Sequence, residues 1–402
     1  MPHHSRDDAP APRPAAGRPP GRAPRGDAAW ARFAGRAATG VVECVDLEDP
    51  AQAERVARGG TWFVVADFEA FGGRSPSGTT GTARAWRFAD VREAGDAAPA
   101  APWHGPAPGD WRSSADRHAY EAAVVRVRSH IREGDVYQVN VCRVLEAPLP
   151  GIGPDGHVVE PDAAALAARL AAGNPAPYAA AIHVPRSSGV DPVWVVGASP
   201  ELYLAVASGP EGATVTSGPI KGTARTADGL RAKDRAENVM ITDLVRNDLQ
   251  RVCRPGTVAV TDLLAVERHP GLVHLVSRVS GVLDPAVAGS ADVWRQVVAA
   301  TFPPGSVSGA PKSSALRIIR ELETAPRGPY CGAVGWIDAD AGTAELSVGI
   351  RTFWWTGEPR GAGGMLRFGT GAGITWGSDP AAEWAETELK AERLVGLASS
   401  GR

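Results

Sequence analysis

The sequence predicts an α+β fold with large, mostly antiparallel sheets. Many short stretches alternate apolar and polar residues or are rich in β-branched residues, as strands are, and several longer stretches repeat apolar residues at helical spacing. These predicted strands and helices follow one another without a strict strand–helix–strand alternation, which favours α+β over a doubly wound parallel sheet.

The N-terminal part of the chain divides into three pieces. Residues 1–28 are rich in Pro, Ala and Arg and lack the apolar run of a secretion signal, so we expect a disordered tail. Residues 29–110 are expected to form the first part of the fold, with TWFVVADFE at 61–69 as the clearest strand. Pro, Ala and Gly dominate 90–113, which predicts a loop or linker.

The middle of the chain begins with a predicted helix that ends at Gly134. Its apolar positions recur at helical spacing at Tyr120, Val124, Val127 and Ile131. The segment DVYQVNVCRVLEAPL, 135–149, alternates like a strand, and residues 161–173 predict a short helix that begins with proline and ends at glycine. Further strands are predicted over 177–184, 193–207 and 211–220.

The last part of the chain again mixes both kinds of element. A helix over 229–252 is closed by Pro255 and Gly256. Strands are predicted over 257–267, 273–282, 330–338, 344–353 and 365–370, and helices over 291–300 and 311–323. A final helix is predicted from Pro380 to Leu397, with Asp379 as its N-cap.

Composition excludes several classes of protein. The 402 residues carry a formal net charge of -3 and no long basic block, which argues against a nucleic-acid partner. No apolar run approaches the roughly 18 residues of a membrane span. The four cysteines lie far apart and form neither a zinc spacing nor a disulfide ladder, at Cys44, Cys142, Cys253 and Cys331. A reducing, cytoplasmic setting is the simplest expectation.

The final helix carries charged residues with one shared face. Glu383, Glu386 and Lys390 stand three and four residues apart, so their side chains lie on the same side. They can form a solvated stripe with Glu386 and Lys390 as an ion pair. Alternatively, the carboxylates bind a hard cation such as Mg²⁺ beside a lysine that holds an anionic substrate.

Glu237 is a second candidate ligand, in the helix predicted over 229–252. It shares the face of the apolar Met240, Ile241 and Leu244, where a carboxylate is costly unless it is paired or binds a metal. An ion pair with Lys233, four residues earlier, is the alternative to a metal.

Lys221 lies in the sequence Pro-Ile-Lys-Gly, which predicts a tight turn followed by Gly222. A partly desolvated lysine can lose its proton and act as a nucleophile, whereas a lysine on an exposed turn has no such role. Both interpretations agree with the local sequence.

Two glycine-rich segments precede helices, PPGSVSGAPK at 303–312 and GTGAGITWGSDP at 369–380. Their backbone N–H groups could hold a carboxylate or phosphate, although neither matches the nucleotide-binding P-loop. Arg351, in a predicted strand, suits a bidentate carboxylate contact or a structural ion pair. His274 has apolar neighbours and, by its surroundings, is a candidate core histidine.

Taken together, nine segments in order resemble the chorismate-utilising enzymes. This family includes component I of aminodeoxychorismate synthase, component I of anthranilate synthase, and the isochorismate and salicylate synthases. The resemblance covers about residues 111–397 and lies in GDVYQVN, ASPELYL, GPIKGTAR, AENVMITDLVRNDL, FPPGSVSGAPK, YCGAVGWI, SVGIRT, GTGAGI and SDPAAEWAETELKA.

The resemblance implies a single large chorismate-binding domain over 111–398, in which two antiparallel sheets pack as a sandwich and helices surround them. It also implies a Mg²⁺ site. Glu237 and Glu386 would ligate the ion, with Glu383 close by, and the ion would bind the ring carboxylate of chorismate.

The resemblance also assigns substrate contacts by position. Glu201 matches a general acid/base that helps the C4 hydroxyl of chorismate leave, and His274 matches a histidine near that hydroxyl. The turn that contacts the ring carboxylate corresponds to Gly222 and Thr223. The enolpyruvyl carboxylate would be held at positions that match Tyr330, Arg351, Gly371, Gly373 and Lys390.

Two positions separate the subfamilies. Family members that use water as the nucleophile have a lysine where this chain has Gln138, which argues against water. Anthranilate synthases usually have alanine where this chain has Lys221, whereas aminodeoxychorismate synthases have lysine there, similar to a covalent nucleophile that adds at C2 of chorismate.

The resemblance therefore favours an aminotransferase that makes 4-amino-4-deoxychorismate, a precursor of p-aminobenzoate and folate, from chorismate and ammonia. The alternative is anthranilate synthase component I, which aminates C2 and releases pyruvate. The 402 residues show no glutaminase domain, so ammonia is expected from a separate glutamine amidotransferase or from solution.

Overall fold

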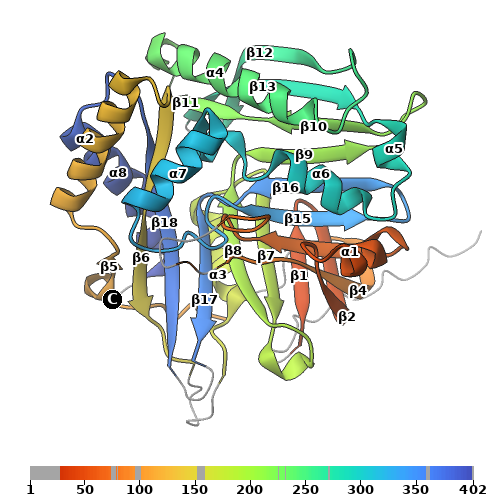
Figure 1. The fold of residues 1–402 in the computed structure, drawn as a ribbon. Coiled ribbons are helices and arrows are strands. Elements are labelled where there is room, and N and C mark those ends of the chain that lie inside the picture. The colour runs from red at the N-terminus through yellow and green to blue at the C-terminus, as the bar shows by residue number, and fades with distance from the viewer. Residues whose placement is uncertain are drawn as a thin grey trace, which may run out of the picture.

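The structure is a computed structural model (Figure 1). It describes residues 28–73, 78, 80–95, 101–151, 159–224, 226–230, 232–269, 272–358 and 363–400. The tail predicted over residues 1–28 lies outside the described residues, apart from Ala28.

Strands make up most of the described chain. They are β1 Trp30–Phe33, β2 Arg36–Asp46, β3 Thr61–Ala66, β4 Ala83–Glu93, β5 Arg112–Ser113, β6 Gln138–Pro148, β7 Tyr178–Val184, β8 Val193–Ser199, β9 Leu202–Ala207, β10 Thr214–Gly218, β11 Ile220–Ala224, β12 Ala259–His269, β13 Leu272–Val282, β14 Gly309–Ala310, β15 Ala333–Asp338, β16 Thr343–Val348, β17 Thr352–Gly357 and β18 Gly364–Ile374. Every pairing between these strands is antiparallel.

The strand pairings form one continuous series rather than two separate sheets. It runs from β12 through β13, β10 with β11, β9, β16, β15, β3, β4, β2, β1, β7, β8, β17 and β18 to β6, and the short β5 and β14 also pair with β6. In Figure 1, β9, β10, β13, β15 and β16 run across the view, while β6, β7, β8, β17 and β18 run down it. The two expected sheets are these two halves of one series.

The helices are α1 Pro50–Ala57, α2 Arg117–Glu133, α3 Ala163–Gly173, α4 Ala232–Leu249, α5 Pro285–Ala288, α6 Val293–Thr301, α7 Lys312–Leu322 and α8 Pro380–Ala398. Helix α4 packs on β11 and β13, α7 on β6, and α8 on β18 with α2 and α3 beside it. Helices around antiparallel sheets confirm the α+β prediction (Figure 1).

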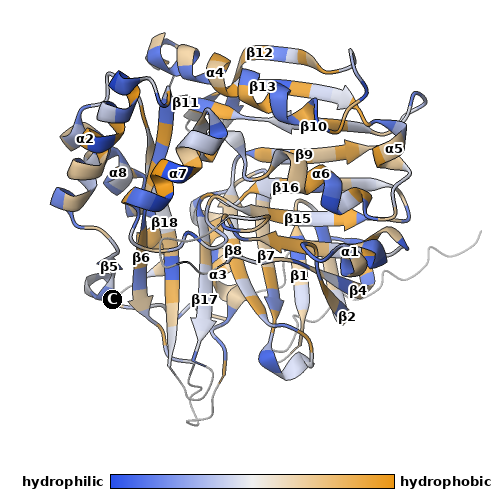
Figure 2. Ribbon diagram, viewed as in Figure 1, coloured by the Kyte–Doolittle hydropathy of each residue, from blue (hydrophilic) through white to orange (hydrophobic). Residues whose placement is uncertain are grey.

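Two apolar clusters hold these layers together. The larger one joins the two halves of the strand series and includes Val141 of β6 and Leu204 of β9. The second lies under α3 and α8 and includes Leu166, Phe353 and Leu394. Figure 2 shows apolar residues along the central strands and many polar residues along the outer helices, as burial of one helix face requires.

Local signals placed the ends of several helices correctly. The carboxylate of Asp379 accepts a hydrogen bond from the backbone N–H of Ala382, and Pro380 stands in the first turn of α8. Helix α2 ends at Gly134, which has a φ of 86°. Glycine adopts this left-handed conformation at little cost, so it ends a helix where other residues would be strained.

Three sequence predictions differ from the structure. Strand β4 extends to Glu93, into the segment predicted as a loop. The strand predicted over 344–353 is broken into β16 and β17, and Arg351 lies in the break with a φ of 53°. Lys221 lies in β11, which pairs with β13, rather than in a turn. In each case a partner strand distant in sequence decides the conformation.

None of the described helices is both long and apolar enough to cross a membrane.

Candidate active site

The candidate site forms where several segments meet near the start of β6. Strand β6 pairs with β18, so Gln138, the first residue of β6, lies next to the end of β18. A Cβ atom placed on Gly373 of β18 would lie 2.3 Å from the Gln138 Nε2 atom and 3.6 Å from the Lys221 Nζ atom. The absence of a side chain at Gly373 therefore leaves the space in which this amide and this amine come together.

Gln138 is buried yet incompletely paired. Its side chain is 1% exposed, and its Oε1 atom has no hydrogen-bond partner among the described residues. A buried amide oxygen without a partner is costly, and such groups are typical of sites that bind a donor.

Lys221 lies among acidic groups on several elements. Burial lowers the pKa of its amine, while Glu237 and Glu201 partly offset this shift and Lys390 adds to it. A lowered pKa increases the fraction of neutral amine, which is the nucleophilic form.

Glu201 lies in the turn between β8 and β9 and is almost completely buried. Its Oε1 atom accepts a hydrogen bond from the N–H of Ile220 at 3.4 Å. Burial raises the pKa of Glu201 to about 7, although hydrogen bonding from Ser306 and the charge of Lys221 act in the opposite direction. A carboxyl group with this pKa can give and take a proton near neutral pH.

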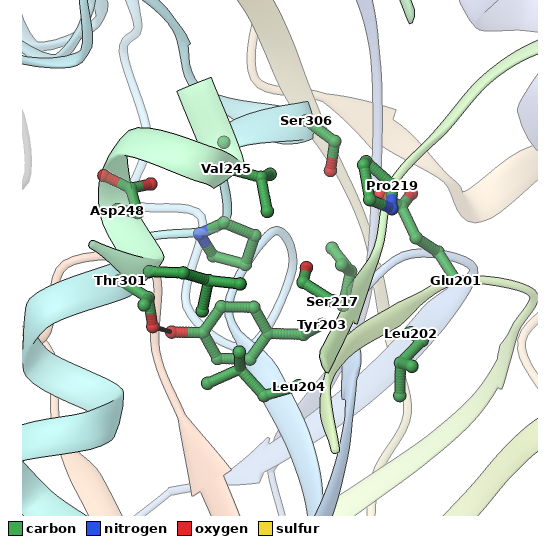
Figure 3. Close-up of a pocket in the computed structure, with 14 residues that line it drawn as sticks. Glu201, Leu202, Tyr203, Leu204, Ser217, Pro219, Val245, Asp248, Thr301 and Ser306 are labelled. Carbon is green, nitrogen blue, oxygen red and sulfur yellow. Dashed lines mark hydrogen bonds between the residues drawn. The ribbon is translucent and has the colours of Figure 1, made fainter. Parts of the chain in front are cut away.

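A narrow cavity lies behind Glu201 (Figure 3). Ser306 lies on the Glu201 side of this cavity, and Asp248 lies across it. Tyr203 lines the cavity and shares a 2.6 Å hydrogen bond with Thr301. The cavity volume of about 10 Å³ is room for roughly one water molecule, so it cannot hold a ring with two carboxylates.

The three predicted metal ligands lie on α4 and α8. Glu383 is 5% exposed, and burial raises the pKa of Glu237. Burial acts in the same direction on Glu386, but the ammonium groups of Lys390 and Lys233 outweigh it and lower its pKa. An Oε1 atom of Glu237 is buried with no hydrogen-bond partner among the described residues.

Both ion pairs considered as alternatives are present. The Lys233 Nζ atom lies 3.6 Å from Glu237 Oε1 and 3.3 Å from Glu383 Oε1, so it joins α4 to α8. The Lys390 Nζ atom lies 2.7 Å from Glu386 Oε1 and donates to the Gly371 carbonyl oxygen at 3.0 Å.

The three carboxylates are chemically suitable ligands for Mg²⁺, but their oxygen atoms do not converge on one point. Hard cations prefer carboxylate oxygens, and the buried Oε1 atom of Glu237, which has an ion pair with Lys233 but no hydrogen bond among the described residues, is the kind of group that a cation satisfies. Among the described residues, however, the group of three or more possible ligand side chains whose ligand atoms all lie within 4.8 Å of one another is a different one, His130, Glu133 and Asp135 at the end of α2. The ligand atoms of Glu237, Glu383 and Glu386 do not all lie within that distance of one another.

Arg351 has an unpaired guanidinium group. Within the described part of the chain, its side chain has no hydrogen bond or ion pair, and burial alone lowers its pKa. The alternative of a structural ion pair is therefore wrong for the described residues. An unpaired, partly buried arginine is suited to bind a carboxylate.

Tyr330 lies directly over β18. A Cβ atom on Gly369 would approach the Tyr330 ring to 2.0 Å, and one on Gly371 would approach the Cys142 Sγ atom to 2.6 Å. The bare glycine backbone of β18 thus admits the buried Tyr330 and Cys142 side chains, and burial raises the pKa of the Tyr330 hydroxyl.

The remaining predicted residues lie on the paired strands β11 and β13. His274 is buried and stands opposite Thr223 in the register of these strands. Gly222 has a φ of 91°, and a Cβ atom there would lie 2.8 Å from the Cβ atom of Asp234. Only glycine fits this position without strain.

Sequence reasoning did not identify two participants. Ser306, which lines the same cavity as Glu201 and lowers the pKa of its carboxyl group, lies in the glycine-rich segment 303–312 that was singled out only for its backbone. Lys233 was considered as a partner of Glu237 alone, and its contact with Glu383 spans 150 residues. Local spacing carries no signal for such a contact.

Comparison with known proteins places the chain in one family. The family model described as chorismate binding enzyme matches residues 31–396. The chain therefore belongs to the chorismate-binding enzymes, an α+β family, and this confirms the resemblance seen in the sequence.

Several curated relatives are similar to this chain. Anthranilate synthase component 1 of Haloferax volcanii is 38% identical over 71% of this chain and 52% of that protein. Aminodeoxychorismate synthase component 1 of Klebsiella aerogenes is 35% identical over 71% of this chain and 59% of that protein. The chain thus spans little more than half the length of the curated relatives it matches.

Solved structures show the same fold. Anthranilate synthase component I of Streptococcus pneumoniae aligns with a TM-score of 0.69 at 22% identity, over 94% of this chain and 95% of that one. The menaquinone-specific isochorismate synthase of Escherichia coli aligns with a TM-score of 0.67 at 17% identity, over 92% and 88%. At such identities the likeness concerns the fold.

Proposed function

We propose that the protein is component I of an aminodeoxychorismate synthase, which converts chorismate and ammonia to 4-amino-4-deoxychorismate and water. The observation that carries this proposal is the position of Lys221. Its amine lies near the Gln138 amide, on the side of Gly373 where other residues would carry a side chain, and burial lowers the pKa of this amine. A lysine in this environment can serve as a nucleophile.

The first half of the proposed reaction uses Lys221 and Glu201. The neutral amine of Lys221 attacks C2 of chorismate, both ring double bonds shift (C1=C2 to C1=C6, and C5=C6 to C4=C5), and the bond between C4 and its hydroxyl oxygen breaks. The Glu201 carboxyl group gives its proton to the leaving hydroxyl, which departs as water. A pKa of about 7 leaves much of Glu201 protonated for this step at neutral pH.

The second half reverses the movement of electrons. Ammonia attacks C4, both ring double bonds shift back, and the bond between C2 and Lys221 breaks, which regenerates the free amine. The new ammonium group loses a proton to Glu201. The sum of both halves is chorismate plus ammonia to aminodeoxychorismate plus water.

Binding of the substrate would use the groups around this centre. The unpaired guanidinium of Arg351 and the Tyr330 hydroxyl suit the enolpyruvyl carboxylate. Mg²⁺ held by Glu237, Glu383 and Glu386 would neutralise the ring carboxylate of chorismate. A separate glutamine amidotransferase would supply ammonia, in line with the component 1 names of the relatives.

The second candidate is anthranilate synthase component I, because several relatives carry that name. It would aminate C2 and release pyruvate. The experiment that separates the two incubates purified protein with chorismate, Mg²⁺ and ammonium at mildly alkaline pH. Product mass and pyruvate release are then measured. An aminated product that keeps its enolpyruvyl group supports the proposal, and anthranilate with pyruvate supports the alternative.

The Lys221→Ala variant tests the covalent route within this reaction. We expect amination to fall by several orders of magnitude, because the attacking group is lost. An unchanged rate with an unchanged product would show that Lys221 is not the nucleophile.

A further inference from the structure

The ammonium group of Lys233 lies between two carboxylates that belong to different helices. Lys233 stands in the first turn of α4, and its Nζ atom is 3.6 Å from Glu237 Oε1 on the same helix. The same Nζ atom is 3.3 Å from Glu383 Oε1 on α8. Lys233 is therefore the cation that joins the two helices at this point.

The two carboxylates need a positive charge nearby. The side chains of Glu237 and Glu383 are only 13% and 6% exposed. Two carboxylates that share one ammonium group lie close enough to repel each other, and a cation between them offsets this repulsion. The charge of Lys221 also acts on Glu237, but the ammonium group of Lys233 is the one that lies within ion-pair distance of both carboxylates in the described structure.

A metal ion and this ammonium group cannot share the space. Mg²⁺ binds carboxylate oxygens at about 2.1 Å, so an ion on Glu237 and Glu383 would lie next to the present position of the Nζ atom. The ligand atoms of Glu237, Glu383 and Glu386 do not all lie within 4.8 Å of one another, so the three carboxylates are not gathered around one point while Lys233 holds its present position.

Lys233 can move away from the carboxylates, whereas Lys390 is held in place. The Lys233 side chain is 38% exposed and ends a flexible stem. Lys390 is different, because its Nζ atom is anchored by the Gly371 carbonyl as well as by Glu386.

We propose that Lys233 is an internal counter-ion of the metal site. Its ammonium group holds Glu237 and Glu383 together in the metal-free protein and withdraws when a divalent cation binds. The competition between Lys233 and the ion sets the affinity of the site for metal. This inference rests on the proposed Mg²⁺ site, but it is independent of which product the enzyme makes.

The test measures metal binding without chorismate. Mn²⁺ serves as a probe in the full-length protein, and free Mn²⁺ is followed by electron paramagnetic resonance, with Mg²⁺ as competitor. We expect Lys233→Met to bind Mn²⁺ about tenfold more tightly than the unchanged protein, since a charge next to the ion is removed. Lys233→Arg should bind it more weakly, because a guanidinium group pairs with carboxylates more firmly.

Arg235→Met is the matched control. It removes one positive charge from the same helix turn, but Arg235 is exposed and has no ion pair within the described residues. Its effect on Mn²⁺ affinity should be less than about twofold. An effect equal to that of Lys233→Met would mean that overall charge, rather than displacement, sets the affinity, and would overturn the proposal.

Thermal unfolding gives a second readout. Metal-free Lys233→Met should melt at a lower temperature than the unchanged protein, because its two carboxylates have lost their counter-ion, and Mg²⁺ should raise its melting temperature by more. Weaker or unchanged metal binding in Lys233→Met would overturn the proposal. Failure of the amination assay would leave this result unaffected, so the two proposals can fail separately.

Discussion

At the scale of single residues, the carboxylates of Glu237 and Glu386 can serve either as partners in ion pairs or as metal ligands. Sequence spacing predicted two interpretations for Glu237 and for Glu386, an ion pair or a metal ligand. The structure contains both ion pairs, with Lys233 and with Lys390. Spacing along one helix could predict these pairs, because they depend on one element only. It could not predict that Lys233 also reaches Glu383 on another helix.

The pKa of Glu201 predicts how the reaction depends on pH. The acid form is needed when the C4 hydroxyl leaves, so kcat/KM for chorismate at saturating ammonia should fall as pH rises above about 7. In Ser306→Ala this fall should move to higher pH, because the Ser306 hydroxyl lowers the pKa of Glu201.

Pairs of pH profiles would check this prediction. Ser308→Ala is the control, because the Ser308 hydroxyl donates to the Pro304 and Gly305 carbonyls in the same segment and not to Glu201. Profiles that coincide for Ser306→Ala and the unchanged protein would contradict the role assigned to Ser306.

At the scale of elements, local signals determined helices better than they determined irregular strands. The start of α8 depends on two neighbouring residues, Asp379 and Pro380, and was predicted correctly. The turn predicted at Lys221 was wrong, because Lys221 lies in β11, which forms by pairing with β13 about 50 residues later. The break at Arg351 was missed for the same reason, because the strands on both sides have distant partners.

The N-cap of α8 supports the site through the element that it starts. Asp379→Ala should lower the free energy of unfolding by about 1 kcal/mol. It should also weaken metal binding, because the N–H of Glu383 donates to the Asp379 carbonyl at 2.9 Å in the turn that the cap holds. Urea unfolding and Mn²⁺ titration would measure the two effects.

Asp162→Ala provides a comparison of the same kind. The Asp162 carboxylate caps α3 by accepting hydrogen bonds from two backbone N–H groups, and α3 contributes no candidate site residue. A similar loss of stability with unchanged metal binding is expected. If both variants altered metal binding equally, the specific contribution of the α8 cap would be disproved.

At the scale of the whole molecule, the N-terminal part is joined to the candidate site through buried polar groups. Glu69, which follows β3, accepts hydrogen bonds from the N–H groups of Arg327 at 2.7 Å and Gly328 at 3.1 Å. The Arg327 side chain in turn donates to the carbonyls of Val307 and Asn140, next to Ser306 and near Gln138. The sequence predicted which elements exist but not this network, whose members lie up to 259 residues apart.

Glu69 should make the stability of the whole fold depend on pH. Burial raises its pKa to about 7 from an ordinary value of 4.5, so the folded protein holds this proton more tightly than the unfolded chain. The resulting stabilisation is complete below pH 4.5 and is lost as pH rises through 7. The shift corresponds to about 3 kcal/mol.

The Glu69→Gln variant isolates this contribution. Glutamine is neutral at every pH, so its free energy of unfolding should decline less between pH 5 and pH 8 than that of the unchanged protein. Urea unfolding at both pH values would measure the difference. Equal declines would show that Glu69 has an ordinary pKa in the folded protein.

The pairing of β3 with β15 has a consequence for how the chain is made. Val64 pairs with Gly335, about 270 residues later, so the apolar strand β3 leaves the ribosome long before its partner exists. At translation rates of roughly 5–20 residues per second, β3 waits about 15–50 s with one edge open. An open apolar strand is a template for aggregation, so production of this protein should be sensitive to chaperone supply and to the speed of translation.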